Sequence, residues 1–315
     1  MIKPILSLAL LGSALAAVSA VAQPASEPPF TIVETGKTFW RLDDAVNSIG
    51  DRAVTIRIAP GVYKDCAVQN YGSITYLAAE PGTVIFDGVA CDDKAALVLR
   101  GRKARVDGIV FRNMSVNDGN GAGIRIEDGN LEVVNSTFRD SEEGILGGAD
   151  KSMSITIDRS TFSGLGRCDR GLSCAHSIYI GTIGTLTITN SRFERGTGGH
   201  YVKSWAARTN VTDSSFDDTK GRDTNYMIDL SGGGVGTIAR NVFVQGANKE
   251  NHSAFITVAP EARHNPSAGL VVADNTASIS PGVGWSPVFV ADWSHEPLAI
   301  GKNNLGKGIR PFEQR

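Results

Sequence analysis

Three short segments of the chain place ionisable or polar side chains inside otherwise strand-like runs. They cover residues 176–180, 200–204 and 226–230. In each segment a central aliphatic residue is followed by a polar one, and these polar residues are Tyr179, Lys203 and Asp229. Side chains alternate between the two faces of a strand, so the three share the outer face if the aliphatic residues face a core. On parallel strands about 4.8 Å apart they would form one column, which we interpret as the active site.

Lys203 is the candidate general base of this column. It lies in an apolar and aromatic run where a plain surface strand would carry Thr or Ser, and a partly desolvated lysine can lose its proton near neutral pH. Tyr179 is a candidate proton donor or acceptor, or else binds sugar by stacking. Asp229 could orient Lys203, bind a cation or form a surface ion pair. The alternative for Lys203 itself is a solvated lysine on an exposed strand.

Two histidines, His176 and His200, begin the first two segments at matching positions. If they stack on adjacent strands, they could supply a general base or neutralise a substrate carboxylate. His200 is favoured, because Gly198 and Gly199 precede it and allow close approach of a ligand. The alternative is that both histidines are hydrogen-bonded at a bend.

The residues around this column suit a substrate that carries carboxylates. Tyr201 and Trp205 offer aromatic surfaces near Lys203. Guanidinium groups bind carboxylates in a bidentate manner, although exposed loop arginines are also common without this role. The candidate substrate-binding arginines are Arg195, Arg208 and Arg222, with Arg167 and Arg170 in the same group of predicted turns.

An acidic segment follows the second of the three segments. Its carboxylates could bind calcium through oxygen ligands, but their spacing is not that of an EF-hand, and a solvated turn is the favoured interpretation. Calcium therefore stays open as a cofactor, and no metal ligands are assigned. The acidic residues are Asp213, Asp217, Asp218 and Asp223.

The bulk properties exclude some classes of partner. The 315 residues are 41% hydrophobic and 20% charged, as expected of a folded chain, and the formal net charge is −2. Nucleic-acid binding usually requires a basic surplus, so we expect no nucleic-acid partner. Residues 1–22 have the basic start, apolar stretch and small residues of a secretory signal, and the apolar stretch is short for a membrane span. We expect an exported bacterial protein, periplasmic or secreted, that is a monomer without a membrane span.

The four cysteines suit two disulfide bonds in an oxidising compartment. Proximity in the sequence favours Cys66 with Cys91 and Cys168 with Cys174, while the two other pairings remain open. The spacing of Cys and His matches no zinc site.

A repeat organises the chain from about residue 104 onward. Each copy has an aliphatic residue, then Asn or Ser in a turn, and ends in Phe, as in residues 133–138, 157–162 and 188–193. The distance between successive Phe residues varies, which is typical of a β-solenoid whose insertions are confined to loops. We expect the Phe residues to stack inside the solenoid and the Asn and Ser residues to form ladders in the turns.

This organisation resembles the right-handed parallel β-helix proteins of the pectate-lyase-like superfamily. The resemblance rests on the predicted helix at residues 39–49, on residues 58–63 with their Pro-Gly-Val-Tyr, and on the Asn-Ser-x-Phe copies. It implies an all-β fold, a right-handed parallel β-helix with an N-terminal capping helix. We expect a signal peptide at 1–22, a flexible tail at 23–30 and one β-helix domain at 31–315, with caps at 31–50 and 281–315.

The resemblance also implies action on acidic polysaccharides. In lyases of this superfamily a Lys or Arg removes the C5 proton of a uronic acid, which requires a base and electrostatic support for the developing dianion. Lys203 as base, Tyr179 or His200 as acid and the nearby arginines as a carboxylate clamp would meet those needs. The favoured interpretation is a polysaccharide lyase. A uronate C5-epimerase and a non-catalytic glycan-binding or envelope β-helix protein remain alternatives.

Overall fold

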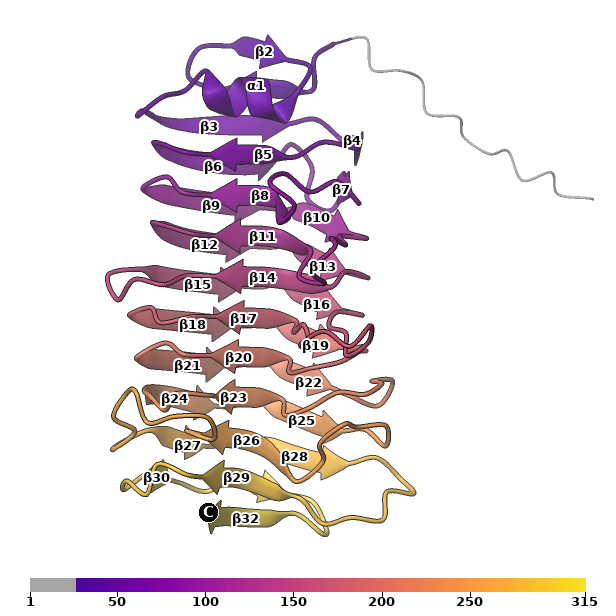
Figure 1. Ribbon diagram of the computed structural model, residues 1–315, viewed down its shortest axis with the longest axis vertical. Helices are drawn as coiled ribbons and strands as arrows, with labels where there is room; N and C mark the ends of the chain where they lie inside the picture. The colour runs from indigo at the N-terminus through magenta and orange to yellow at the C-terminus, as the bar shows by residue number, and fades with distance from the viewer. Residues whose placement is uncertain (1–26) are drawn as a thin grey trace, which may run out of the picture.

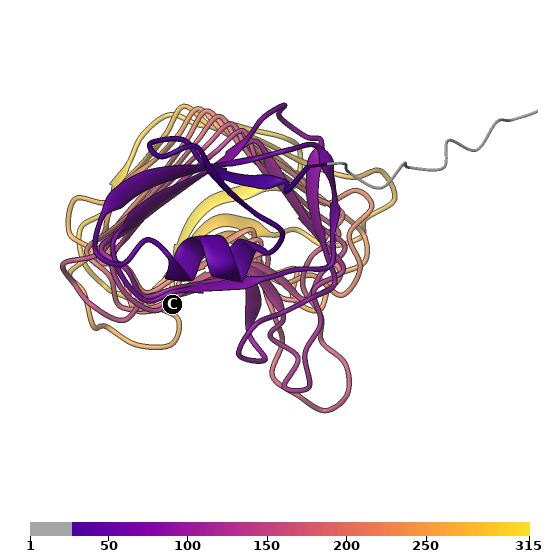
Figure 2. The ribbon, with the colours of Figure 1, turned by 90° about the horizontal axis from the view of Figure 1, so that it is seen from above.

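The chain winds into a solenoid of three parallel β-sheets. The computed structural model describes residues 27–315, and Figure 1 shows the coils stacked along one long axis. The expected signal peptide at 1–22 and residues 23–26 of the expected tail at 23–30 lie outside the described residues, while Phe30 already begins the first strand. Seen along the axis, the strands of successive coils superpose around a common interior, and loops of different lengths project from the corners (Figure 2).

The chain passes through the three sheets in the same order in each coil, and we name them sheets A, B and C. Sheet A has 12 strands, of which β1 and β2 are antiparallel additions at its start. Its strands are β2 (Lys37–Phe39), β1 (Phe30–Ile32), β3 (Ala53–Ile58), β6 (Ser73–Ala78), β9 (Lys103–Asp107), β12 (Asn130–Val134), β15 (Ser154–Asp158), β18 (Thr185–Thr189), β21 (Arg208–Thr212), β24 (Val235–Ala239), β27 (Val271–Ala273) and β30 (Ala299–Ile300).

Sheets B and C have 10 strands each. The strands of sheet B are β4 (Gly61–Tyr63), β7 (Val84–Asp87), β10 (Ile109–Arg112), β13 (Thr137–Arg139), β16 (Thr161–Ser163), β19 (Arg192–Glu194), β22 (Ser215–Asp217), β25 (Val242–Gln245), β28 (Thr276–Ile279) and β31 (Asn304–Leu305). The strands of sheet C are β5 (Ala67–Gln69), β8 (Ala95–Leu99), β11 (Ala122–Ile126), β14 (Glu143–Gly147), β17 (Ile178–Ile180), β20 (Val202–Ser204), β23 (Ile228–Leu230), β26 (Ala254–Val258), β29 (Val288–Asp292) and β32 (Arg310–Gln314).

The repeated phenylalanines form a continuous stack inside sheet B, as the repeat predicts. The rings of Phe138 and Phe162 lie 4.9 Å apart, and those of Phe193 and Phe216 lie 4.7 Å apart, both nearly parallel. All four side chains are buried. Aromatic pairs at this separation add to the free energy gained from burying their surface, so the stack fixes the coil-to-coil register.

The turn between sheets A and B contains a hydrogen-bonded ladder. Asn135 and Asn190 adopt positive φ there, a conformation that asparagine tolerates better than most residues. The following serines bond from coil to coil: the backbone N–H of Ser136 donates to Oγ of Ser160 at 3.2 Å, and that of Ser160 donates to Oγ of Ser191 at 3.2 Å. The ladder confirms the predicted Asn and Ser positions in the turns.

The described part of the chain has one short helix, α1 (Leu42–Asn47), at the N-terminal end of the solenoid (Figure 1). It is shorter than the helix expected at residues 39–49, because Lys37–Phe39 forms strand β2. At the other end, residues 281–315 contain β29 to β32, which continue the three sheets. None of the described helices is long and apolar enough to cross a membrane.

Candidate active site

A bend at the start of the sheet C strands determines which side chains face outward. Two successive residues point into the core at this bend, as Tyr201 and Val202 do in one coil, and Met227 and Ile228 in the next. Such a doubled inward position resembles a β-bulge in its effect. The outward-facing residues on either side are therefore three positions apart, and they form two parallel columns on the outer face of sheet C.

The second column along the chain direction contains the residues singled out from the sequence. Tyr179 of β17 pairs with Lys203 of β20, which pairs with Asp229 of β23. Nζ of Lys203 lies 5.4 Å from the centre of the Tyr179 ring and 3.9 Å from Oδ2 of Asp229. The structure thus brings the phenol, ammonium and carboxylate onto one outer face.

The first column consists of His176, His200 and Tyr226. The rings of the two histidines stack with centres 4.9 Å apart, and the ring of Tyr226 stacks on His200 at 5.6 Å. The backbone N–H of His200 donates to Nδ1 of His176 at 3.0 Å. Nδ1 of His176 is therefore an acceptor, which places the proton of the neutral ring on Nε2.

Both histidines are uncharged at neutral pH. Burial, reinforced by the charge of Lys203, lowers the pKa of His200 to about 3. Burial also holds the pKa of His176 well below its usual range. Only 5% of His176 and 8% of His200 is exposed. A charged histidine here would lose its hydration next to an ammonium group, so the neutral ring is favoured.

The carboxyl of Asp229 is buried beneath Lys203 and held by hydroxyl groups. Oγ of Ser231 donates to it at 2.7 Å and Oγ1 of Thr257 at 2.8 Å. Burial raises the pKa of Asp229 above its ordinary value, against the lowering effect of these hydrogen bonds and of Lys203. Because Asp229 is fixed by two side chains, it in turn fixes the position of the Lys203 ammonium.

Glu261 provides a second carboxylate for Lys203. Its Oε1 accepts a hydrogen bond from Nζ of Lys203, and its side chain is 45% exposed. The backbone N–H of Glu261 donates to the carbonyl of Ser231 at 3.1 Å, which anchors the start of this loop. Unlike the buried Asp229, Glu261 can leave Lys203 by moving a side chain into solvent.

A polar cavity of about 330 Å³ opens over the two columns. The loop closed by the Cys168–Cys174 disulfide forms one wall through Ser173 and Cys174. Asn225 and Glu250 line the cavity from later coils, and Nδ2 of Asn225 donates to Oε2 of Glu250 at 2.6 Å. The size falls within the range of ligand sites, and the lining offers both charges and hydrogen-bond donors.

The two disulfides pair the cysteines that are close in sequence, Cys66 with Cys91 and Cys168 with Cys174. The second lies at the cavity, while the first joins the neighbourhood of β5 to the turn before β8. The loop of the second is also held by Arg167, whose guanidinium donates to the carbonyl of Ser173 at 3.0 Å.

Tyr201, expected from the sequence to bind substrate, points into the interior and does not line the cavity. The bend turns it inward, where 1% of it is exposed and its hydroxyl donates to Oδ1 of Asp218 at 2.7 Å. Asp218 also accepts from Thr224 and, at 2.9 Å, from the buried Nζ of Lys249. The network thus holds Tyr201, the residue after His200, and Thr224, the residue before Asn225.

The expected arginine clamp is not formed, because the coil distributes the arginines over different faces. Arg208 lies in β21 of sheet A. Arg195 follows β19 and donates to Oγ of Ser163 at 2.9 Å. None of the expected arginines, Arg222 included, is among the residues that line the cavity. Trp205 follows β20 and packs on His264, with ring centres 5.3 Å apart, beyond the Lys203 end of the site.

The acidic segment does not fit a calcium site. Asp213 forms an ion pair with Arg240 at 2.7 Å, and Asp218 is occupied by the buried Lys249. Among the described residues, the one cluster with metal-ligand spacing is Cys168, Cys174 and Glu250, and its two sulfur atoms are joined in a disulfide.

Several residues of the site escaped the sequence reasoning. Tyr226 had a detectable signal, since it lies three positions before Asp229 as His200 does before Lys203. Glu143, fully buried with a pKa raised well above its usual range by burial, lies one coil before His176. The sequence signal for Glu143 was weaker, because it consisted only of an acidic residue before an apolar strand. Glu261 lies in a long loop without a repeat, so no pattern pointed to it.

Comparisons with known proteins agree with the β-helix fold. A family model described as a right-handed beta helix region matches residues 86–245 and 122–284. The solved structure of an alginate lyase from Paenibacillus sp. str. FPU-7 is similar with a TM-score of 0.68 and 17% identity, covering 86% of this chain and 94% of that one. ORF18 of Geobacillus virus E2 is similar with a TM-score of 0.55 and 14% identity, covering 86% of this chain and 55% of that one. At these identities the likeness concerns the fold. A search of curated proteins gave no significant match.

Proposed function

The chain belongs to the right-handed β-helix family, and on that scaffold we propose an exported polysaccharide lyase that cleaves a uronic-acid-containing polysaccharide by β-elimination. The observation that carries the proposal is the adjacent pair Tyr179 and Lys203 on the outer face of sheet C, at a polar cavity. A phenol and an amine side by side can donate and accept a proton across one sugar linkage.

In the proposed reaction the Nζ of Lys203, as a neutral amine, takes the C5 proton of the uronate. The C4–C5 double bond then forms as the C4–O bond breaks, and the hydroxyl of Tyr179 gives its proton to the leaving oxygen. The polymer covers the cavity when it binds and excludes water from Lys203 and Tyr179. Glu261 leaves Lys203 when the substrate binds, because the ion pair between its carboxylate and Nζ of Lys203 blocks the atom that the substrate must reach.

His176 stabilises the substrate carboxylate as a neutral hydrogen-bond donor. His176 lines the cavity and carries its proton on Nε2, as the acceptor role of its Nδ1 requires. His200 is a poor source of the leaving-group proton, since its pKa of about 3 keeps it unprotonated. Tyr179 is therefore preferred over His200 as the acid. A donor aimed at a charge that grows in the transition state lowers the barrier more than one that binds both states equally.

Export and domain organisation are part of the same proposal. Two disulfides suit an oxidising compartment, which supports removal of residues 1–22 as a signal peptide and a periplasmic or secreted location. We assign residues 31–315 to one domain that acts as a monomer, with α1 and β2 covering the open edge of the first coil.

The test is a screen of the purified chain on uronic-acid polymers, followed by near-ultraviolet absorbance of the unsaturated product. Alginate is the first polymer to test, since a protein of similar structure is an alginate lyase. Product that absorbs and accumulates with time supports the proposal. A change in sugar composition without cleavage would instead indicate an epimerase, and binding without either change a glycan-binding protein.

A further inference from the structure

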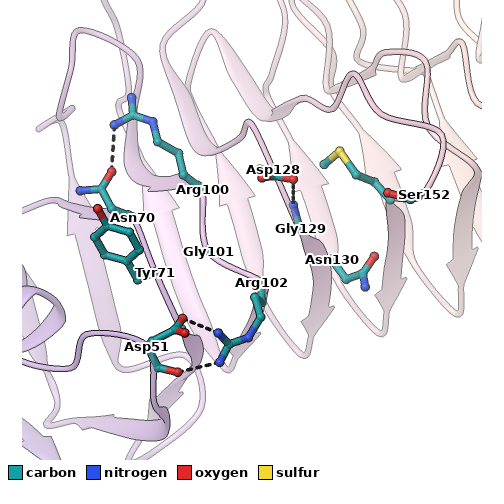
Figure 3. Close-up of a pocket in the computed structure, with 12 residues that line it drawn as sticks. Asp51, Asn70, Tyr71, Arg100, Gly101, Arg102, Asp128, Gly129, Asn130 and Ser152 are labelled. Carbon is teal, nitrogen blue, oxygen red and sulfur yellow. Dashed lines mark hydrogen bonds and ion pairs between the residues drawn. The ribbon is translucent and has the colours of Figure 1, made fainter.

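A second polar cavity lies on another corner of the solenoid, where sheet C turns into sheet A. It has a volume of about 410 Å³ and spans the turns after β5, β8, β11 and β14. Figure 3 shows its residues, among them Tyr71 and Arg100 on one side and Asn130 and Ser152 on the other. We call it the Tyr71 pocket. It shares no lining residue with the cavity over Lys203.

The floor of the Tyr71 pocket is backbone, because glycines occupy it in successive coils. A Cβ on Gly129 would lie 2.0 Å from the carbonyl oxygen of Gly101, and one on Gly101 would lie 2.6 Å from that of Tyr71. Gly72 and Gly129 also adopt positive φ. The coils therefore approach each other closely here, and the hollow is built into the backbone rather than left between mobile side chains.

The rim combines an aromatic face with hydrogen-bonding groups. Tyr71 is 68% exposed, the largest exposed fraction among the large hydrophobic side chains described. Asn70, like Tyr71, follows β5, and its Oδ1 accepts a hydrogen bond from Nη1 of Arg100 at 3.4 Å. Oδ1 of Asn130 accepts a hydrogen bond from the backbone N–H of Ser154 at 2.8 Å, which leaves Nδ2 of Asn130 to donate to a ligand. An exposed aromatic ring next to amides and hydroxyls suits the apolar face and the hydroxyl edge of a sugar.

The charges of the pocket can exchange with those of an acidic ligand. Arg102 forms its ion pair with Asp51 at the surface, where the two side chains are 56% and 75% exposed. Exposed pairs of this kind contribute little to stability, so a ligand carboxylate can replace Asp51 at little cost. Arg100 is held more firmly by Glu127 and Asp92, both at 2.6 Å, and orients Asn70.

From these features we infer that the Tyr71 pocket is a second carbohydrate-binding site, which holds sugar units of an acidic polysaccharide away from the point of cleavage. A sugar ring stacks on Tyr71, and its carboxylate binds Arg102 in place of Asp51. The substrate class rests on the proposed function, whereas the site does not depend on the chemistry at Lys203.

The spacing of the coils lets one polymer chain reach both sites. Tyr71 follows β5 and Lys203 lies in β20, and these strands are five steps apart in sheet C. At about 4.8 Å per step the two residues are about 24 Å apart along the axis. A long chain can occupy both sites at once, which raises its apparent affinity, while a short oligosaccharide reaches only the cavity over Lys203.

Binding is measured in the Lys203→Ala background, so that the polymer stays intact. Affinity electrophoresis in gels that contain alginate or polygalacturonate compares this protein with its Tyr71→Ala derivative. We expect Tyr71→Ala to weaken binding about fivefold, as loss of one aromatic contact would, and Arg102→Gln to weaken it by a similar factor. Trp40→Ala is the matched control, since Trp40 is 62% exposed and lies outside the pocket. Unchanged binding in Tyr71→Ala overturns the site, and unchanged binding in Arg102→Gln overturns the carboxylate contact.

A kinetic comparison separates this inference from the proposed function. In otherwise wild-type protein, Tyr71→Ala should raise KM for the polymer about fivefold. It should leave kcat for the polymer unchanged, and likewise both kcat and KM for a tetrasaccharide. An equal rise of KM for the tetrasaccharide would contradict a separate site. Tyr71-dependent binding by a protein that releases no unsaturated product would overturn the proposed function and retain the site. Turnover with Tyr71-independent binding would overturn the site alone.

Discussion

The ammonium group of Lys203 lies over the ring of Tyr179, 5.4 Å from its centre, although 24 residues separate the two in the chain. They are direct neighbours because β17 and β20 pair in parallel with Ile178 opposite Val202. The solenoid thus converts a distance along the sequence into one step of a ladder. The same ladder places Asp229 on the other side of Lys203.

Replacing Tyr179 with Phe should lower kcat about 100-fold, the usual contribution of a positioned acid, while KM for the polymer stays within about twofold. The ring that contacts Lys203 and His176 is kept, so only the proton donor is lost. Initial rates from product absorbance measure both constants. Tyr71→Phe is the control, because it removes a phenol hydroxyl outside this site, and an equal loss in both variants would argue against Tyr179 as the acid.

Removing the Glu261 carboxylate should separate binding from chemistry. In Glu261→Gln the substrate no longer competes with a charged group at Lys203, so KM for an acidic polymer should fall. The expected change is about threefold, because an exposed ion pair contributes only a small free energy. Glu250→Gln is the comparison, since Glu250 lines the cavity and bonds to Asn225 rather than to Lys203. A raised KM in Glu261→Gln would show that this carboxylate helps to hold the substrate rather than yielding to it.

The histidine column predicts a loss of stability in acid. The folded-state pKa of His200 is about 3, below the 6.5 of a free imidazole, so the unfolded chain binds a proton first as the pH falls. Its contribution to stability is thus complete above pH 6.5 and declines toward pH 3, by about 2 kcal/mol at pH 5. The buried Glu143, whose pKa is raised, acts in the opposite sense. The difference between wild type and His200→Gln in denaturant unfolding, measured from pH 7 to pH 5, isolates the histidine. A difference that does not change with pH would contradict a depressed pKa.

The buried network around Asp218 should contribute more to stability than its partly exposed neighbour Asp217. Asp218→Asn leaves the fully buried ammonium of Lys249 without its carboxylate, and breaking such a pair costs about 3–5 kcal/mol. Asp217→Asn changes a partly exposed residue one position earlier and should cost less than about 0.5 kcal/mol. Denaturant midpoints of the two variants test this, and equal midpoints would contradict the importance of the pair.

The two disulfides should differ in what their loss affects. Opening Cys66–Cys91 by double substitution with Ala should cost about 3 kcal/mol and leave kcat unchanged, because it closes a longer loop away from the cavity. Opening Cys168–Cys174 should cost slightly less stability but raise KM, since this loop walls the cavity. Thermal midpoints and initial rates of the two double variants provide the comparison, and the reverse pattern would contradict the assigned wall.

The sequence predicted the solenoid well because its period is recorded in side chains that repeat every coil. The Phe residues and the Asn-Ser turns each occupy one position of the coil, and stacking such positions reproduces the register that places Tyr179, Lys203 and Asp229 together. The bend in sheet C has no such marker. Two inward residues in succession turned Tyr201 into the core, where alternation alone would place it outside with Lys203.

The positions of the loop residues could not be predicted from the sequence, for a different reason. The arginines lie in insertions whose length varies from coil to coil, so their direction depends on each loop's own hydrogen bonds, as with Arg195 on Ser163. Glu261 reaches Lys203 from 58 residues further along. A contact of that kind requires the coordinates of the coil and the loop together.

The most direct test of the account is the turnover of Lys203→Ala on a polymer that the wild-type chain cleaves. We expect the rate of unsaturated product to fall at least about 1,000-fold, with unchanged circular dichroism and retained binding in affinity electrophoresis. Folded Lys203→Ala protein that still forms this product at a rate near that of the wild type would contradict Lys203 as the base.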